Sequence, residues 1–227
     1  MFELKLFNPI SSQMETVLAL SDVSEAEALL KARDFLFQHG VKFGELVAEG
    51  EPRGKNVFGF EDEPSVADQG GGFGFLPSSP IYHVFKHIRD VLDTDIRSFI
   101  DLGCGPGNIL MSAHRLLGAT RLTGVEIDSG LVARARENTA QFDAAIIEAD
   151  LMEWEPEINE FDMIYMYEPI RDEAKRLRFL AHLSTWLNEG QHVFYQHAVG
   201  KVPAWFTPVD LAPYRHPCLY TFDGNKT

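Results

Sequence analysis

A short glycine-rich stretch holds the residues whose types and spacing most clearly indicate chemistry. Residues 101–108 read DLGCGPGN, an acid followed by glycines at three alternate positions. Glycine at such positions lets the backbone turn sharply and lets a ligand touch the main chain. A dinucleotide-binding fingerprint requires G-x-G-x-x-G, and Asn108 stands where its last glycine belongs. The stretch therefore predicts a nucleotide-type ligand and leaves its identity open.

Two further acids end the next two predicted strands. Glu126 ends the strand in RLTGVEID, and Asp150 ends the strand in AAIIEAD. A carboxylate at the first place can accept hydrogen bonds from both ribose hydroxyls, and one at the second can accept from an adenine amino group, with the Leu151 backbone beside it. In an open parallel sheet, ligands bind outside the carboxyl ends of the strands. These acids therefore predict an adenosine-binding edge.

A regular alternation of predicted strands and helices must position these acids. Such alternation predicts right-handed βαβ units and a parallel sheet with helices on both faces. The tail, 198–227, breaks the alternation and is expected to add one or two strands, including 217–223 antiparallel at the edge. The expected strands are 97–103, 121–128, 144–150, 161–169 and 191–197, and the expected helices are 79–92 (capped by Ser79), 108–118, 129–140 (capped by Ser129) and 171–190.

Residues 1–60 are expected to form a small αβ unit without chemistry of its own. Its segments FELKLF, METVLAL and FGELVAEGE alternate as strands do. The helix between them has a capping box, Ser24 and Glu27, and Gly40 at its C-terminal end. The sequence leaves open whether this extension is a lid, a substrate-recognition element or a dimer contact.

Residues 61–78 are rich in acids, glycines and prolines and are expected to form a flexible loop. A plain linker is one interpretation. A flap that closes over a ligand is the other, because Phe73 and Phe75 stand among the glycines.

The combined pattern resembles the class I S-adenosylmethionine-dependent methyltransferases over roughly residues 79–197. The first motif of that family, an acid followed by G-x-G-x-G, matches Asp101 and the three glycines up to Gly107. The resemblance implies an α/β fold with a seven-stranded, mostly parallel Rossmann-like sheet, helices on both faces and strand order 3-2-1-4-5-7-6, the seventh strand being antiparallel. Residues 79–227 would be the S-adenosylmethionine-binding methyltransferase domain, preceded by the small N-terminal αβ extension.

The resemblance also implies which residues meet the cofactor, S-adenosylmethionine. The glycine loop would pass close to its methionine part, Glu126 would hold the ribose, and Ile127 would pack on the adenine. The implied cofactor-binding residues are Asp101, Gly103, Cys104, Gly105, Glu126, Ile127, Asp150, Leu151 and Tyr167.

The end of the fourth strand is where the family carries reaction-specific residues. Methyltransferases that act on the amino groups of bases or of glutamine have Asn/Asp-Pro-Pro-aromatic there, whereas this chain has Tyr167, Glu168, Pro169 and Ile170. Methylation of adenine or glutamine is therefore not expected. Tyr167 and Glu168 are the candidate catalytic residues; Tyr167 could instead line the cofactor pocket, and Glu168 could cap the next helix.

Charge and composition exclude several classes of partner and site. The formal net charge is −14, and the resulting field repels a phosphate backbone, so nucleic acid is not expected as a partner. The sequence has no apolar run long enough for a membrane span and no secretory h-region, which favours a cytoplasmic enzyme. Its two cysteines suggest neither a disulfide framework nor a metal cage.

The sequence therefore predicts an S-adenosylmethionine-dependent methyltransferase that transfers a methyl group by in-line displacement. The acceptor, a small molecule or a protein, and the oligomeric state are not readable from it. Two alternatives stay open: a catalytically inactive protein that binds S-adenosylmethionine or S-adenosylhomocysteine, and an NAD-dependent oxidoreductase.

Overall fold

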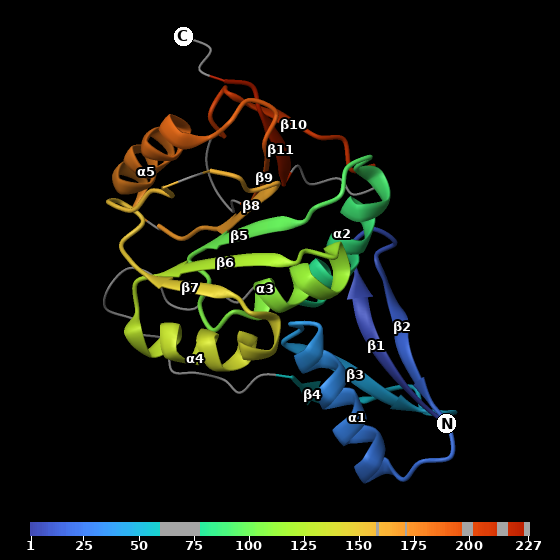
Figure 1. The fold of residues 1–227 in the computed structure, drawn as a ribbon. Coiled ribbons are helices and arrows are strands. Elements are labelled where there is room, and N and C mark those ends of the chain that lie inside the picture. The colour runs from blue at the N-terminus through green and yellow to red at the C-terminus, as the bar shows by residue number, and fades with distance from the viewer. Residues whose placement is uncertain (60–77, 158, 171, 197–201, 213–217, 225–227) are drawn as a thin grey trace.

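The protein is built around two β-sheets that differ in size and in strand direction. The computed structural model describes residues 1–59, 78–157, 159–170, 172–196, 202–212 and 218–224. The larger sheet has seven strands, and the smaller has four strands from the N-terminal part of the chain (Figure 1). The expected flap lies outside the described residues, apart from Ser78.

The larger sheet has the strand order β10-β11-β9-β8-β5-β6-β7. Numbered along the sheet's own strands, this is 3-2-1-4-5-7-6 read from the other end, so the predicted order is confirmed. β11 is antiparallel to both neighbours, as expected, while β5, β6, β7, β8 and β9 run parallel. The strands are β5 (Ser98–Leu102), β6 (Arg121–Glu126), β7 (Ala145–Glu148), β8 (Met163–Tyr167), β9 (His192–Gln196), β10 (Phe206–Pro208) and β11 (Leu219–Phe222).

Helices cover both faces of this sheet, because its central strands are apolar on both sides. In β5 all five residues are buried, with Phe99 in one core cluster and Ile100 in the other. The first cluster includes residues of α2 (Ser78–Val91), α3 (Asn108–Ser112) and α4 (Ser129–Thr139); the second includes residues of α5 (Glu173–Trp186). None of the described helices has the length and apolar character that would let it span a membrane.

Several helix ends differ from those expected. α2 begins at Ser78, and Pro80 is tolerated because the first-turn N–H groups have no partner within the helix. α4 is capped by Asp128, whose Oδ1 accepts from the N–H of Leu131 at 2.9 Å, and not by Ser129. The expected helix 108–118 is α3 followed by a π-helix, η1 (Ala113–Leu117), which stops at Gly118 with a φ of 83°. A short 3₁₀ turn, η2 (Ala140–Phe142), follows α4.

The smaller sheet is antiparallel, with the order β2-β1-β3-β4. Its strands are β1 (Phe2–Asn8), β2 (Gln13–Leu20), β3 (Phe43–Ala48) and β4 (Lys55–Phe58); α1 (Glu25–Gln38) joins β2 to β3. At the start of α1, Ser24 Oγ accepts from the N–H of Glu27 at 3.3 Å, so the predicted cap is confirmed. β4 was not expected from the sequence.

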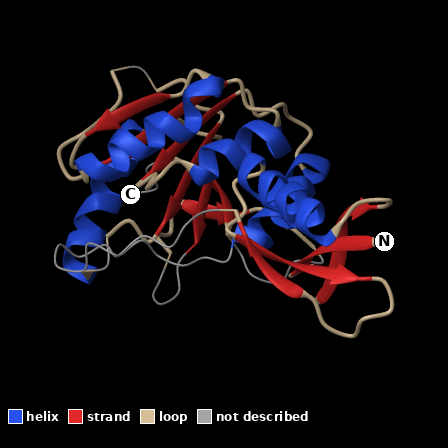
Figure 2. Ribbon diagram, turned by 90° about the horizontal axis from the view of Figure 1, so that it is seen from below, coloured by secondary structure: helices blue, strands red, loops and turns tan. Residues whose placement is uncertain are grey.

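The smaller sheet packs on the helices of the larger part through one continuous core. Leu4 and Leu6 of β1 are fully buried in the same apolar cluster as Ile81 and Phe85 of α2. Figure 2 shows the smaller sheet to one side of the larger one, at the end marked N. The N-terminal unit, residues 1–59, is thus attached to the larger part by buried side chains as well as by the chain.

The Asp128 cap can be tested by paired substitutions. Asp128→Ala removes the acceptor at the start of α4 and should lower stability by about 1 kcal/mol, a fall of roughly 3 °C in Tm for a chain of this size. Ser129→Ala, one residue on, should change Tm by much less in the same thermal denaturation. A larger loss for Ser129→Ala would show that the cap is misassigned.

Candidate active site

The glycine loop, residues 103–107, turns back over β6 directly after β5. The N–H groups of Gly103 and Cys104 donate to the carbonyl of Val125 at 2.8 and 3.0 Å. Gly103 has a φ of +85°, and a Cβ on it would lie 3.1 Å from the Cβ of Pro169. The loop thus follows a path that favours glycine and is approached closely by the segment after β8.

Glu126, the last residue of β6, connects the glycine loop with the segment that leads into α4. Its Oε2 accepts from the N–H of Gly105 at 3.0 Å, while its Oε1 accepts from the N–H groups of Ile127 and Asp128 at 2.8 and 3.0 Å. A carboxylate offers about four acceptor positions. Three are used here, so binding both hydroxyls of a ribose would require at least one backbone donor to move.

Asp101 lies on β5 beside this arrangement and is only 2% exposed. Its side chain makes no hydrogen bond with the described part of the chain. Burial, together with the negative charge of Glu126, raises the pKa of Asp101 well above its ordinary value. A buried carboxyl in this position favours either a proton or a cationic partner.

The Cys104 side chain is buried against β6. It is 2% exposed, and a Cβ on Gly124 of β6 would lie 2.7 Å from its Sγ. Burial, with the nearby charges of Asp101 and Glu126, raises the pKa of the Cys104 thiol. The backbone of Cys104 alone is available to a ligand, and its thiol is unsuited to act as a nucleophile.

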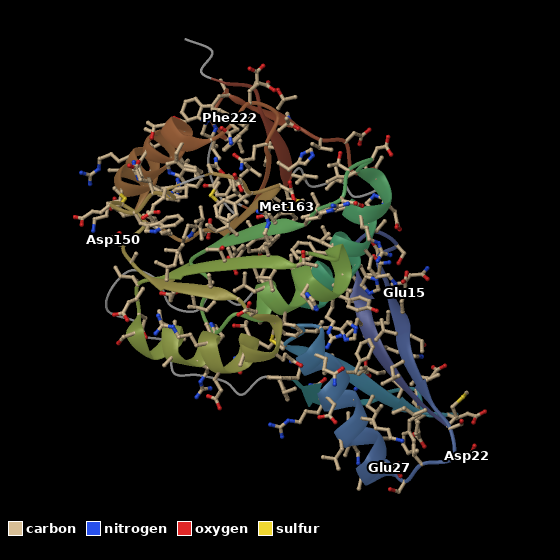
Figure 3. The ribbon with its side chains drawn as sticks, viewed as in Figure 1. Glu15, Asp22, Glu27, Asp150, Met163 and Phe222 are labelled. Atoms are coloured by element: carbon tan, nitrogen blue, oxygen red, sulfur yellow. The ribbon has the colours of Figure 1, made fainter. Side chains whose placement is uncertain are left out.

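Three further predicted cofactor-binding residues lie at the same edge, just after β6 and β7: Ile127, Asp150 and Leu151. The Ile127 side chain is 60% exposed, unusual for a large apolar residue beside a buried strand. Asp150 is exposed and accepts from the N–H of Met152 at 2.8 Å; Figure 3 shows it at the edge where the parallel strands end. The Leu151 side chain is buried in the core cluster that contains α5, which leaves only its backbone to meet a ligand.

Tyr167, Glu168 and Pro169 follow β8, the neighbour of β5. Tyr167 is partly buried against the core cluster that contains α2 and α3. Glu168 has a φ of +38°, a left-handed conformation that is rare outside glycine. Strained backbone of this kind concentrates at functional sites and persists only where the surrounding structure imposes it.

Tyr195 of β9 is a neighbour of this segment that sequence reasoning missed. It lies opposite Met166 in the parallel register of β8 and β9, close to the carboxyl end of both strands. Burial raises the pKa of Tyr195; the charge of Arg176 opposes this shift, and that of Glu168 adds to it. The only signal in the sequence was a tyrosine near the end of a buried strand.

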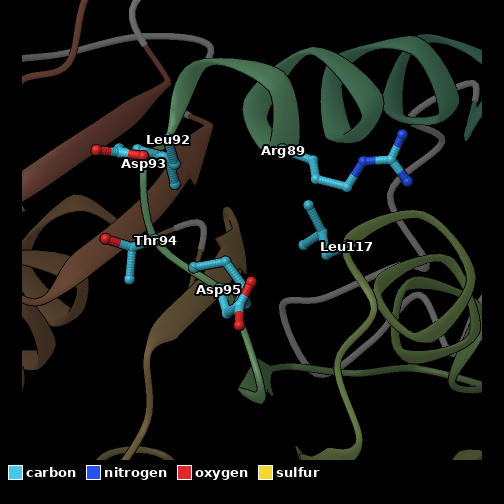
Figure 4. Close-up of a pocket in the computed structure, with 7 residues that line it drawn as sticks. Arg89, Leu92, Asp93, Thr94, Asp95 and Leu117 are labelled. Carbon is cyan, nitrogen blue, oxygen red and sulfur yellow. The ribbon is translucent and has the colours of Figure 1, made fainter.

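A pocket of about 450 Å³ lies at the opposite edge of the sheet (Figure 4). Its lining comes from the end of α2, the segment that leads into β5, and Leu117 of η1. It contains Arg89 together with the acids Asp93 and Asp95. Since it adjoins the start of β5, it is separate from the candidate active site at the carboxyl ends of the strands.

The match to a protein family agrees with this geometry. Residues 99–190 match the family model described as a methyltransferase domain. This part of the chain is similar to a methyltransferase domain, and it makes up 92 of the 227 residues. The observed strand order is also the one implied by the resemblance to the class I S-adenosylmethionine-dependent methyltransferases.

The curated relatives match this chain over part of their own length. Trans-aconitate 2-methyltransferase of Escherichia coli O139:H28 (strain E24377A / ETEC) is 33% identical over 94 residues, 41% of this chain and 36% of that enzyme. The enzyme of the same name from Shigella dysenteriae serotype 1 (strain Sd197) is 34% identical over 88 residues, 39% of this chain and 34% of the relative. This chain thus spans about a third of the length of the curated relatives it matches.

Solved structures similar to part of this chain include complexes with S-adenosylhomocysteine. An RNA methyltransferase from Salinibacter ruber in complex with S-adenosyl-L-homocysteine is 26% identical, with a TM-score of 0.45 over 65% of this chain and 94% of that chain. The plantazolicin methyltransferase BpumL in complex with SAH is 19% identical, with a TM-score of 0.43 over 50% of this chain and 44% of that chain.

The buried carboxyl of Asp101 predicts a stability that depends on pH. Because its pKa is raised in the folded state, the folded chain binds more protons than the unfolded chain as pH rises above about 3.9, and stability falls. Asp101→Asn has nearly the same shape and no such loss, so it should raise Tm at pH 7, by roughly 3 °C for each kcal/mol.

The gain in Tm from Asp101→Asn should shrink as the pH is lowered toward 4, because the carboxyl of the unfolded chain, with a pKa of about 3.9, then begins to bind the proton that the folded chain already holds. Thermal denaturation from pH 4 to pH 8 measures this trend. An equal Tm for the two proteins at pH 7 would contradict the effect assigned to Asp101.

Proposed function

We propose that this chain is an S-adenosylmethionine-dependent methyltransferase that acts on a small molecule or a protein held beside Tyr167 and Glu168. The observation that carries the proposal is the bond from Gly105 to Glu126, which joins the glycine loop to the acid at the end of the next strand. That contact brings together the two features from which a class I cofactor site is built. A net charge of −14 favours an acceptor other than nucleic acid.

The residues at this edge suit S-adenosylmethionine. Asp101 is a buried carboxyl with no hydrogen bond to the described residues, and a cation is its natural partner. Glu126 has one acceptor position left for a ribose hydroxyl, and the exposed Ile127 offers an apolar surface for adenine. The backbone from Gly103 to Gly105 would border the methionine part, while Asp150 and the Leu151 backbone would meet the adenine edge.

The cofactor supplies a methyl carbon already activated by its sulfonium charge. The protein then has to align the acceptor with that carbon and exclude water. Tyr167 would contact the acceptor or form a wall of the site. Glu168 would orient the acceptor atom and accept its proton where the nucleophile arrives protonated.

The name of the curated relatives suggests one methyl acceptor to test. Trans-aconitate 2-methyltransferase is named for an acid, and such an acceptor would bring carboxylates near Glu168. Like charges at short range oppose binding, and a neutral or amine nucleophile would not meet this penalty. We therefore infer an acceptor that is less acidic than trans-aconitate.

Methyl transfer tests the proposal directly. This chain, incubated with a cell extract and S-adenosylmethionine labelled in its methyl group, should label a component of the extract, which is then separated by size into metabolites and proteins. Glu168→Gln, which keeps the shape and removes the charge, should lower the rate by about 100-fold or more if Glu168 takes a proton. Trans-aconitate is assayed separately and should be a poor acceptor.

The outcomes of the transfer assay separate the alternatives. Binding of the cofactor without label on any fraction would support the inactive binding protein instead. Efficient transfer to trans-aconitate would overturn the inferred acceptor class and leave the reaction type intact.

Cofactor binding tests the role of Glu126. Glu126→Ala removes charge-assisted hydrogen bonds worth roughly 1.5–3 kcal/mol and should weaken binding of S-adenosylhomocysteine by about 10- to 100-fold. Glu137→Ala, an exposed acid on α4, makes the same change of charge away from the site and should leave the Kd unchanged. Calorimetry with S-adenosylhomocysteine measures the Kd of both variants, and an unchanged Kd in Glu126→Ala would refute the role of Glu126. The same measurement with NAD tests the oxidoreductase alternative.

A further inference from the structure

The connection between α1 and β3 contacts the helix that follows the glycine loop. The hydroxyl of Ser112, a fully buried residue of α3, donates to the carbonyl of His39 at 2.6 Å. Gly40 follows with a φ of +66°, and a Cβ on it would overlap the carbonyl oxygen of Asn108 and lie 2.5 Å from Ser112 Oγ. The two backbones are therefore in direct contact, without room for a side chain between them.

This contact is made on the helical turn that begins at the glycine loop. Gly107 is the N-cap of α3, and its carbonyl accepts from the N–H of Met111 at 3.2 Å. A displacement of Asn108 would move Gly107 and the loop amides before it, because they are consecutive residues. The position of the loop thus depends on what lies against the first turn of α3.

Other parts of the methyltransferase domain support the loop at other points. Asn138 at the end of α4 donates from Nδ2 to the carbonyl of Pro106 at 2.9 Å. Glu126 holds the N–H of Gly105, and Pro169 approaches Gly103. The N-terminal unit supplies the contact on the Asn108 side.

The α1–β3 connection is itself firmly held. The His39 ring stacks on Phe35 at 4.1 Å between centroids, and its Nδ1 lies 2.8 Å from the Phe35 carbonyl. The N–H of Val41 donates to the carbonyl of Leu36 at 2.8 Å, and both side chains are fully buried. A connection fixed in this way can hold the first turn of α3 in one position.

The position of the N-terminal unit differs from that of a lid over the strand ends. In Figure 3, Asp150 marks the edge where the parallel strands end, while Glu15 on β2 lies on the other side of the molecule. The N-terminal unit contacts α3 through the connection that follows α1, at His39 and Gly40.

We propose that the N-terminal unit positions the cofactor loop, with Gly40 and Ser112 as the positioning residues that hold the first turn of α3. The inference rests on the proposed function, because it assigns the loop to the cofactor. It assigns to the N-terminal unit a role in cofactor affinity, which the sequence alone left undecided among a lid, a recognition element and a dimer contact.

Two glycine substitutions in the N-terminal unit test this role. Gly40→Ala and Gly50→Ala both place alanine at a positive φ, +66° and +85°, so both incur backbone strain. A Cβ on Gly50 meets nothing within 4 Å, whereas one on Gly40 collides with α3. Calorimetry with S-adenosylhomocysteine should give a Kd at least about tenfold weaker for Gly40→Ala, since small misplacements of a site are costly, and an unchanged Kd for Gly50→Ala.

Hydrogen exchange gives a readout that needs no cofactor. The amides of residues 103–112 should exchange faster in Gly40→Ala than in the wild type and in Gly50→Ala. Equal Kd and equal exchange in the two variants would overturn the proposal. Should the wild type fail to bind S-adenosylhomocysteine, the proposed function is wrong, and exchange alone decides whether the N-terminal unit holds the loop.

Ser112→Ala keeps the proposal testable if Gly40→Ala does not fold. Loss of the bond to His39 should weaken S-adenosylhomocysteine binding by about threefold to tenfold and speed exchange at residues 103–112, with the Gly50→Ala protein again as the reference. A Ser112→Ala protein with wild-type affinity and wild-type exchange would overturn the positioning role.

Discussion

The carboxylate of Glu126 joins three segments that would otherwise be independent: the end of β6, the glycine loop after β5 and the residues that begin α4. It does so with hydrogen bonds to backbone N–H groups, which no substitution at the donor residues other than proline can remove. Because Gly105, Ile127 and Asp128 all depend on one side chain, the geometry of the candidate site is set at the end of a buried strand. Charge-assisted bonds to backbone donors are among the stronger hydrogen bonds in proteins.

The same edge places two carboxyl groups close together, which is electrostatically unfavourable when no cation is bound. Asp101 is buried close to Glu126, and the pKa of Asp101 is raised by burial and by that neighbouring charge. A cationic ligand would offset this cost, and the proposed methyl donor carries a sulfonium and an ammonium group that could do so. The positive φ of Glu168 adds backbone strain at the same edge.

The sequence predicts those features that arise from local pattern, and it misses those that arise from contacts. The alternation of elements predicted a parallel sheet, and the resemblance to class I methyltransferases supplied its strand order. The spacing of Ser24 and Glu27 predicted the cap of α1. The π-helix after α3 was missed because an added residue in a turn leaves apolar periodicity almost unchanged. Asp128 was passed over for its neighbour Ser129, since both residue types are good caps. The role of Gly40 depends on a helix almost 70 positions away and has no local signal.

The apolar cluster that runs from the N-terminal unit into α2 has a consequence for how the chain evolves and how it can be divided. Leu4 and Leu6 share that cluster with Ile81 and Phe85, so neither side closes its own core. A fragment starting at α2 would carry an uncovered apolar face, and large faces of this kind promote aggregation. The N-terminal unit is therefore not an interchangeable module: any replacement by recombination would have to bring a matching surface for α2 and a small residue opposite Asn108.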